Sequence, residues 1–549
     1  CLRNTVLFAF ISVPLSTILA LLISVALASI KPLQKAYQSI LFLPYLTNAL
    51  SIGAVFAAMF NVVGTKAQLA NGKGTWGLIN NMFGSHIHWV DGDASTIAMM
   101  IVVIVYEVWS GLPFKILILF GALQNVNKQY YDAAKVDGAN KFTTLWRITV
   151  PLISPMISYL VITGFIGGFK SYTAIVGIFG NKMGPSNQYE MGTIVGLIYK
   201  YLGEPTGVGT ASAAALILFV LIMIFTFINM QVSKKRVHYR RDNMTEINNN
   251  ISSENLNIDI AKQLKKQKAL KITKSVIAYV FLTIFAIFAL LPFYWMILSS
   301  LKTETVYREP IPTFFVKPSE LQWKNYQTVV QYGNNLFGSM LLNTIIVGIV
   351  STLLGIIVTI ITAYAFAKME FKGKNFLFSL LLATMMIPGE LFTITNFLTV
   401  NNLGWTKSYT VMILPFLVSV FYIYLLRNAF KQIPDSLYKA AKVDGCSDVK
   451  YLVKVMVPLT APTLISIILL KFIGTWNSYI WPRLANGGSE EWQLLSNWVS
   501  KGFTAAGSSE SLTTLKMAAA TMVSLPLLIL FICFRKYIMR GVSKSGIKG

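Results

Sequence analysis

The segment Asp132-Ala-Ala-Lys-Val-Asp-Gly138 occurs again, with one change, as Lys439-Ala-Ala-Lys-Val-Asp-Gly445. Each copy is followed by a Val-Pro pair that ends at Pro151 in the first copy and at Pro458 in the second. The corresponding residues lie 307 positions apart throughout, so the two copies align without a gap. Self-similarity at a fixed distance indicates a chain built from two related halves.

Each copy predicts a helix, a turn and a second short helix. Alanines favour helix, whereas Gly138 and Gly445 can adopt the left-handed conformation that ends one. The second helix begins near Asn140 and carries large apolar residues such as Phe142 and Trp146. We expect each segment to lie along a membrane surface and present an apolar knob to a partner. The residues assigned to the two segments are Asp132, Ala133, Ala134, Asp137, Gly138, Ala139, Pro151, Lys439, Ala440, Ala441, Asp444, Gly445 and Pro458.

An amphipathic surface helix without a partner would explain one such segment. It does not explain two copies with identical internal spacing, so we favour a docking function for both.

The composition is that of an all-α integral membrane protein. Of 549 residues, 54% are hydrophobic and only 13% are charged. Apolar runs of about 20 residues, enough to cross the hydrocarbon core as a helix, recur along the chain. They predict about 11 membrane helices, five before and six after a break. The expected spans are 4–30, 37–60, 96–120, 156–180, 209–231, 273–299, 337–366, 375–398, 409–427, 460–481 and 514–534.

The net charge of +25 comes mainly from loops between the apolar runs. This distribution places those loops in the cytoplasm and argues against nucleic acid as a partner. The expected cytoplasmic segments are 31–35, 125–151, 232–272, 368–374, 427–458 and 535–548, and the expected external ones are 61–95, 181–208, 300–336 and 482–513.

We therefore expect three parts. Residues 1–232 form a first membrane domain, 233–271 a flexible cytoplasmic linker, and 272–549 a second membrane domain. The linker contains a polar stretch rich in Asn and Ser, which buries too little apolar surface to fold. Alternation of the spans places residue 1 outside and the start of the second half inside, so the first half is expected to lack its leading helix.

No nucleotide-binding or catalytic motif is present. The pairs Gly72-Lys73 and Gly373-Lys374 are not followed by Ser or Thr and lack the preceding glycine spacing of a phosphate-binding loop. The three cysteines, Cys1, Cys446 and Cys533, form no metal-binding pattern. We expect a chain that is not an enzyme and carries no metal or cofactor of its own.

The repeated segments resemble the EAA coupling loops of ABC-importer permeases. The resemblance extends over nearly the whole chain and is closest to the carbohydrate-uptake (maltose and multiple-sugar type) permeases, with two partner permeases fused. Lys439 departs from the family pattern, which has an acid at that position. The other motifs that carry the resemblance are Trp109-Ser-Gly-Leu-Pro113, Ala363-Tyr-Ala-Phe-Ala-Lys368, Met386-Ile-Pro388 and Trp476-Asn-Ser-Tyr479.

The resemblance implies two helical bundles of the type I importer fold in the cytoplasmic membrane. It implies two ATPase subunits inside, which bind ATP and Mg, and a solute-binding protein outside. The implied function is carbohydrate import by alternating access.

The fifth helix of each half carries the residues expected to contact a sugar. Phe169 and Tyr172 are three positions apart and are expected to share one helical face, and the same offset maps them and Lys170 onto Trp476, Tyr479 and Asn477. Aromatic faces suit a sugar ring and polar groups suit its hydroxyls. Glu107 and Lys170 lie inside expected spans, where an ionisable group is costly and therefore a functional candidate, and Trp109 lies beside Glu107.

The alternatives are that Lys170 reaches an interface, that Glu107 lies near one, and that the aromatic residues only pack between helices.

The external loop with Trp76, His86, His88 and Trp89 is a candidate dock for a binding protein. The two histidines with Asp91 and Asp93 form only a weak metal-ligand set.

Other functions remain open. The same machine would serve a polyol or a glycerophosphodiester, whereas an ion-coupled secondary transporter would need intramembrane carboxylates and no docking loops. A membrane-anchored scaffold would leave the polar residues of the spans without a function.

Overall fold

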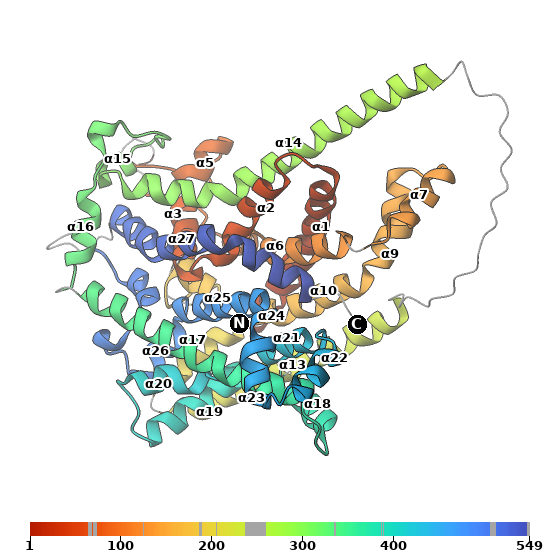
Figure 1. The fold of residues 1–549 in the computed structure, drawn as a ribbon. Helices are drawn as coiled ribbons and strands as arrows, with labels where there is room; N and C mark the ends of the chain where they lie inside the picture. The colour runs from red at the N-terminus through yellow and green to blue at the C-terminus, as the bar shows by residue number, and fades with distance from the viewer. Residues whose placement is uncertain are drawn as a thin grey trace.

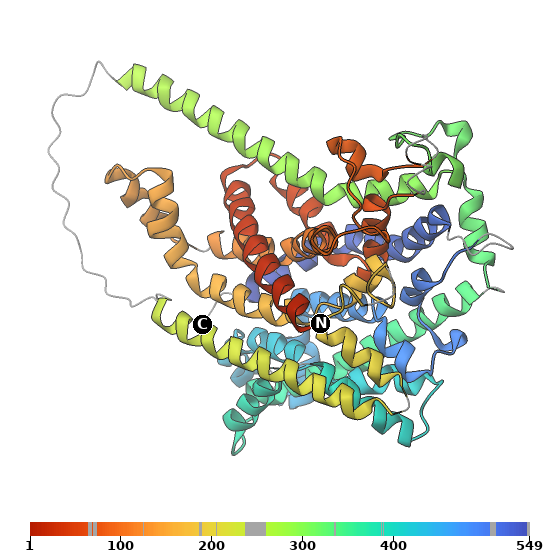
Figure 2. The same cartoon turned by 180° about the vertical axis from the view of Figure 1, so that it is seen from behind.

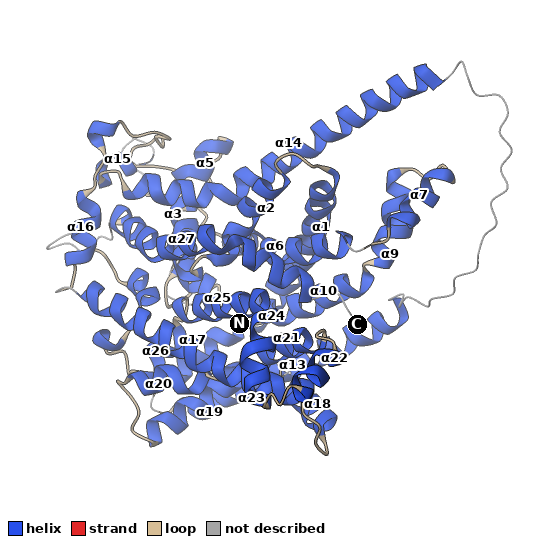
Figure 3. Cartoon of the chain, in the orientation of Figure 1, coloured by secondary structure: helices blue, strands red, loops and turns tan. Residues whose placement is uncertain are grey.

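The computed structural model describes residues 1–63, 69, 74–124, 126–185, 189–204, 206–236, 260–333, 336–385, 387, 389–504 and 512–545. Within these ranges the chain is helical apart from loops and one antiparallel bridge between Val63 and Thr75 (Figure 3). The predicted all-α class is confirmed. Gly72-Lys73, Met386 and Pro388 lie outside the described residues.

In the described part of the chain, six long helices are apolar enough to cross a membrane. Five further helix pairs pass the same test but bend by 47° to 100° at a short break. Counting each pair as one span gives up to 11 spans, which agrees with the predicted number. The long helices are α1 (Leu2–Ser29), α6 (Thr96–Gln124), α13 (Val208–Arg236), α14 (Ile260–Ser300), α17 (Leu336–Lys368) and α27 (Thr513–Ser545).

The broken spans combine shorter helices. The first half contains α2 (Gln34–Phe42), η1 (Leu43–Leu46), α3 (Ala49–Phe60), α5 (Gly77–Phe83), α7 (Lys128–Val136), α8 (Lys141–Thr144), η2 (Leu145–Thr149), α9 (Val150–Leu152), α10 (Ser154–Phe169), α11 (Thr173–Phe179) and α12 (Ile194–Leu202). The second half contains α15 (Glu304–Tyr307), η3 (Pro318–Glu320), α16 (Lys324–Gln331), α18 (Lys374–Thr384), α19 (Gly389–Asn402), α20 (Tyr409–Ile413), η4 (Leu414–Phe416), α21 (Val420–Lys431), α22 (Asp435–Val443), α23 (Asp448–Tyr451), η5 (Leu452–Met456), α24 (Val457–Leu459), α25 (Ala461–Trp476), α26 (Ile480–Ala485), η6 (Glu490–Trp492) and η7 (Leu495–Ser500).

Helices of each half pack against helices of the other half (Figures 1 and 2). Helix α14 of the second half packs on α1, α2 and α3, and α27 packs on α3 and α6. In return, α13 of the first half packs on α19. Hydrogen bonds also join the halves: the indole Nε1 of Trp109 donates to the carbonyl of Phe288 at 3.2 Å. Such bonds matter in lipid, where apolar contact between helices gains little over contact with acyl chains.

An Asn-Thr pair near the start of one helix in each half holds a distant loop in the same way. Asn4 Nδ2 donates to the carbonyls of Glu190 (2.8 Å) and Gly192 (3.1 Å). Asn343 Nδ2 donates to those of Glu491 (2.7 Å) and Gln493 (3.2 Å). The neighbouring hydroxyls accept one backbone N–H each, Thr5 from Ile194 and Thr344 from Leu495. The two halves therefore also share a pattern of buried polar contacts, although Asn4 and Asn343 lie 339 rather than 307 positions apart.

The helices continue into the segment expected to be a linker. Helix α13 ends at Arg236 and α14 begins at Ile260, so both reach into 233–271. Residues 237–259, which include the Asn- and Ser-rich stretch, lie outside the described part of the chain.

Candidate coupling segments and the region between the halves

The repeated segments have the same backbone. Helix α7 is closed by a bond from the N–H of Ala139 to the carbonyl of Ala134, and α22 by one from Cys446 to Ala441, both 2.9 Å long. The turn residue of each is in the left-handed region, Gly138 at φ 68° and Gly445 at φ 69°. This is the glycine-dependent helix stop that the sequence predicts.

The second helix of each segment starts on a polar cap. The Asn140 side chain accepts from the N–H of Thr143 at 2.7 Å, and the Ser447 hydroxyl accepts from that of Lys450 at 3.3 Å. Such caps satisfy an N–H group that has no partner within the helix.

A π-helical turn follows each short helix, η2 in the first segment and η5 in the second. Pro151 and Pro458 lie just after these turns and have no N–H to donate, so the regular hydrogen-bond ladder cannot continue. The chain then bends by 70° into α10 and by 82° into α25. Each segment thus meets the following membrane helix at a steep angle.

Three apolar side chains stand out of each segment at matching positions. They form what we call the apolar knobs. Their exposed fractions are 80% for Val136 and 88% for Val443, 72% for Phe142 and for Val449, and 50% for Trp146 and 58% for Val453.

The second segment is held by side chains that the first lacks. Asp448 Oδ1 accepts from the hydroxyls of Tyr438 (2.9 Å) and Tyr364 (3.2 Å) and lies 3.1 Å from Lys442 Nζ. At the other end of the segment, Lys368 Nζ contacts the carboxylate of Asp435 at 2.5 Å. In the first segment the positions of both acids carry lysine, Lys141 and Lys128. Figure 1 shows α7 projecting from the helical body, whereas α22 and α23 lie against it and share an apolar cluster with α21.

These contacts favour the charged form of both acids. Hydrogen bonds from Tyr438 and Lys442 hold the pKa of Asp448 below its ordinary value, and the bond from Lys368 does the same for Asp435. The bond to Asp448 raises the pKa of Lys442. The second segment therefore keeps its ion pairs at neutral pH.

The fifth helix of each half breaks earlier than expected. Helix α10 ends at Phe169 with Lys170 as its C-cap, and α25 ends at Trp476 with Asn477 as its C-cap. Tyr172 and Tyr479 begin the next short helices. The prediction that Phe169 and Tyr172, or Trp476 and Tyr479, share a helical face is therefore wrong.

Hydroxyl groups stabilise both breaks. Thr193 Oγ1 donates to the carbonyl of Ser171 at 3.0 Å, and Ser496 Oγ donates to that of Ser478. These carbonyls follow the last turn of a helix and need an external partner. The Ser171 hydroxyl is meanwhile free to donate to the carboxylate of Glu107.

Several expected pathway residues are packed inside the protein. Trp109, Phe169 and Trp476 are buried, and the indole of Trp476 donates to the carbonyl of Val523 at 3.1 Å. Phe169 also lines an apolar groove of 530 Å³ between α1 and α13. For these three residues the packing alternative describes the structure.

Two of the other expected residues, Lys170 and Tyr479, contact side chains of the opposite half. Lys170 Nζ lies 3.4 Å from the carboxylate of Glu390 in α19. The Tyr479 hydroxyl contacts Asn181 Oδ1 at 3.1 Å, and Arg483 Nη1 donates to both groups at 2.7 Å. Tyr172 packs against Tyr199 of the same half, with ring centroids 4.9 Å apart and the ring planes tilted by 54°.

Glu390, Arg483 and Asn181 were not identified from the sequence. Glu390 had a recognisable signal, since it is an acid inside the expected span 375–398.

Two lysines inside spans were also missed, and both have structural partners. Lys115 Nζ donates to the carbonyl of Val13 (3.2 Å) and to the hydroxyls of Ser16 (2.5 Å) and Thr17 (3.1 Å). Lys471 Nζ donates to the carbonyl of Phe416 at 2.9 Å, at the break between α20 and α21. Each lysine donates hydrogen bonds to carbonyl or hydroxyl groups of a neighbouring helical segment. A charged residue in a span is therefore not by itself evidence of contact with the cargo.

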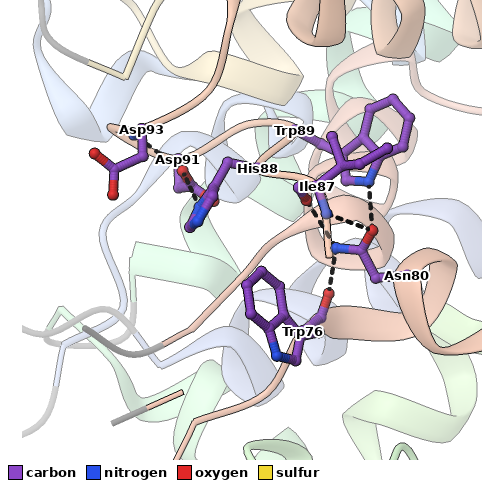
Figure 4. Close-up of polar contacts among 7 residues, drawn as sticks. All are labelled: Trp76, Asn80, Ile87, His88, Trp89, Asp91 and Asp93. Carbon is purple, nitrogen blue, oxygen red and sulfur yellow. Dashed lines mark hydrogen bonds and ion pairs between the residues drawn. The ribbon is translucent and has the colours of Figure 1, made fainter. Parts of the chain in front are cut away.

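The loop that contains Trp76 and Trp89 is organised around Asn80 (Figure 4). The Asn80 amide donates to the carbonyls of Trp76 (3.0 Å) and Ile87 (2.8 Å) and accepts from the indole of Trp89 at 2.9 Å. His88 Nδ1 lies 2.9 Å from the Asp91 carboxylate, which also accepts from the N–H of Asp93.

The loop also packs on the first half, through Trp89 against Phe60 of α3 with ring centroids 5.5 Å apart. Trp76 packs against His86 with ring centroids 4.7 Å apart, and the most exposed large apolar side chain of the loop is Phe83. Among the described residues, no group of three or more His, Cys, Asp or Glu side chains is placed to hold a metal ion.

The chain is similar to known permeases. Arabinooligosaccharides transport system permease protein AraQ of Halalkalibacterium halodurans is 29% identical over 273 residues, 50% of this chain and 95% of that protein. sn-Glycerol-3-phosphate transport system permease protein UgpE of Pectobacterium atrosepticum is 27% identical over 275 residues, 49% of this chain and 96% of that protein. A crystal structure of a bacterial ABC transporter involved in the import of alginate matches with 24% identity and a TM-score of 0.42, covering 52% of this chain and 99% of that one.

The profile of one family matches both halves. This family is described as "Binding-protein-dependent transport system inner membrane component", and it matches residues 5–238 and 355–544. The two matched regions contain the two coupling segments with their common backbone. The chain belongs to this family of ABC-importer permeases, transport proteins rather than enzymes, and carries two permeases fused in one polypeptide.

Proposed function

We propose that the chain imports an oligosaccharide by alternating access, driven by two ATPase subunits that dock on its coupling segments. The observation that carries the proposal is the pair of apolar knobs, which expose Val136, Phe142 and Trp146 and, at the same internal spacing, Val443, Val449 and Val453. Exposed apolar groups at matched positions suit two related clefts on a partner.

The order of the spans supports a common side for both knobs. If every span crosses once, α6 and α21 run in the same direction and lead into the two segments. The linker between α13 and α14 then lies on that side as well. The basic residues of these segments make this the cytoplasmic face.

The family description supports a solute-binding protein on the opposite face. We assign three parts to the chain, a first permease domain (1–232), a connecting segment (233–271) and a second permease domain (272–549). ATP and Mg bind to the partner subunits in this proposal.

The cargo assignment rests on the relatives. A permease for arabinooligosaccharides favours an oligosaccharide, and the relative for sn-glycerol 3-phosphate makes a phosphorylated polyol the second candidate. Uptake by vesicles that contain the chain, its ATPase and its binding protein distinguishes the two, with labelled arabino-oligosaccharide and labelled glycerol 3-phosphate as probes. Uptake of the oligosaccharide alone supports the proposal.

The docking assignment is tested with Val136→Asp and Val443→Asp. Both residues are highly exposed, so a carboxylate there leaves folding intact but adds an unpaired charge to a docked interface. We expect the ATPase subunits to dissociate from the double variant on co-purification and ATP-driven uptake to be lost. The control is Phe83→Asp, the same kind of change at an exposed apolar residue of the outer loop. Full ATPase retention by the double variant would refute the docking role.

A further inference from the structure

An ion pair joins the two halves at two helix breaks. Lys170 is the C-cap of α10 in the first half, and Glu390 lies in the first turn of α19 in the second. Their charged groups are 3.4 Å apart and largely covered, with 26% and 14% of the side chains exposed. A cation at a helix C-terminus and an anion at an N-terminus each also interact favourably with their own helix.

The matching contact at the fifth-helix break of the second half is neutral. Asn477, which the repeat maps onto Lys170, donates from Nδ2 to the carbonyl of Thr47 at 3.4 Å. Thr47 lies at the break between η1 and α3, just as Glu390 follows the break between α18 and α19. Both fifth-helix C-caps therefore contact a broken span of the opposite half, once through charges and once through a single neutral bond.

The surroundings of the ion pair also belong to both halves. Helix α12 of the first half, which carries Tyr199, packs on α19, the helix that carries Glu390. Asn181 of the first half bonds Tyr479 and Arg483 of the second. A relative movement of the halves at this level must break these contacts.

We propose that Lys170 and Glu390 are a positioning pair that holds the halves together away from the coupling segments and separates in each transport cycle. Helix α10 is 16 residues long, so the pair lies about 24 Å from the first coupling segment, measured along the axis of α10. Charges inside a membrane protein are stabilised by their partner rather than by water, so losing one partner favours the separated arrangement in which the other is hydrated. The neutral contact at Asn477 is the weaker of the two links.

The inference rests on alternating access, but its test needs no ATPase, binding protein or sugar. The full chain, with Cys1, Cys446 and Cys533 replaced by serine, is reconstituted in lipid vesicles. Spin labels are attached at Phe83→Cys and Leu403→Cys, two exposed positions on loops of different halves. Pulsed electron resonance then measures the distribution of distances between the labels.

We expect Lys170→Gln and Glu390→Gln each to raise the ratio of separated to closed molecules by about tenfold, an ordinary size for coupling between two sites. The charge exchange K170E/E390K is expected to restore much of the closed population. K170Q/E390Q leaves no unpaired charge to destabilise the fold and is expected to be more open than the parent. Lys317→Gln is the matched control, because the Lys317–Glu320 pair is 79% and 59% exposed and lies within one half.

An unchanged distance distribution in K170Q/E390Q would overturn the proposal. So would an exchange variant that is as open as the single variants. Neither result would bear on the docking of the ATPase, which the aspartate variants of the knobs test separately.

Discussion

The two coupling segments share a backbone and differ in what holds them. Both have a glycine turn, a polar cap, a π-helical turn and a proline at matching positions. The first carries an aromatic knob, with the rings of Phe142 and Trp146 6.1 Å apart, whereas the second carries valines and is fixed to α17 through Asp448. The backbone path is therefore the same in both segments, whereas the exposed side chains and the local anchorage differ. The docking proposal accordingly depends most on the backbone path.

The largest effect is expected where the two segments are alike. A Cβ added at Gly138 or Gly445 meets no atom within 4 Å, but both residues have positive φ, where a valine costs about 1–2 kcal/mol. We expect the double variant to lose its helix stops and most ATP-driven uptake, measured in vesicles. Gly92→Val is the control, since that glycine is equally open and has no positive φ. Normal uptake by the double variant would mean that the common backbone is not needed.

A smaller effect is expected from exchanging the knobs. F142V/W146V removes about 1 kcal/mol of apolar burial per residue from a docked first segment, so ATPase affinity should fall by about tenfold or more. V449F/V453W should strengthen binding at the second segment or block it by overfilling the cleft. Titration of the ATPase onto the chain in detergent measures both. Equal affinities in all variants would show that the knobs do not reach the partner.

The anchorage of the second segment is tested by Asp448→Asn. The change removes the ion pair with Lys442 and weakens the bonds from Tyr438 and Tyr364. We expect amide exchange in α22 and α23 to rise by about twofold, as is ordinary for an exposed ion pair. Helices α7 and α8 should exchange as before, and a change there instead would contradict the assignment.

The smallest effect is a pH dependence confined to the second segment. Asp435 and Asp448 have lowered pKa values, so their stabilisation is complete above the ordinary range of an aspartate and is lost as the pH falls through the lowered values. A dye on Cys446, in a chain with Cys1 and Cys533 replaced by serine, should gain mobility only below about pH 4. The same dye at Ala139→Cys, with Cys446 also replaced, should show no such step. A step in both would point to general unfolding.

Much of the fold could be predicted because apolar runs and a repeated motif can be recognised in the sequence itself. The apolar runs predict the six long helices and the five bent pairs of the described residues, and the Ala-Ala-Lys-Val-Asp-Gly pattern predicts the glycine turns. The broken fifth helices were not predicted, because the hydroxyls of Thr193 and Ser496 that stabilise the breaks come from distant loops.

The same limit applies to the candidate site. The sequence does not distinguish an aromatic residue that faces a cavity from one that packs between helices. Trp476 is of the second kind, because its indole donates a hydrogen bond to a neighbouring helix. The link between Lys170 and Glu390 depends on how α10 and α19 meet across the halves, which no local pattern encodes.

The most direct measurement asks whether both segments lie on the ATPase side of the membrane. Cys446 and an introduced Ala139→Cys occupy matching positions, and each can be studied alone after Cys1 and Cys533 are replaced by serine. In sealed vesicles of known orientation, a membrane-impermeant thiol reagent should label both from the cytoplasmic face only, and bound ATPase subunits should protect both. Labelling of the two cysteines from opposite faces would contradict the account.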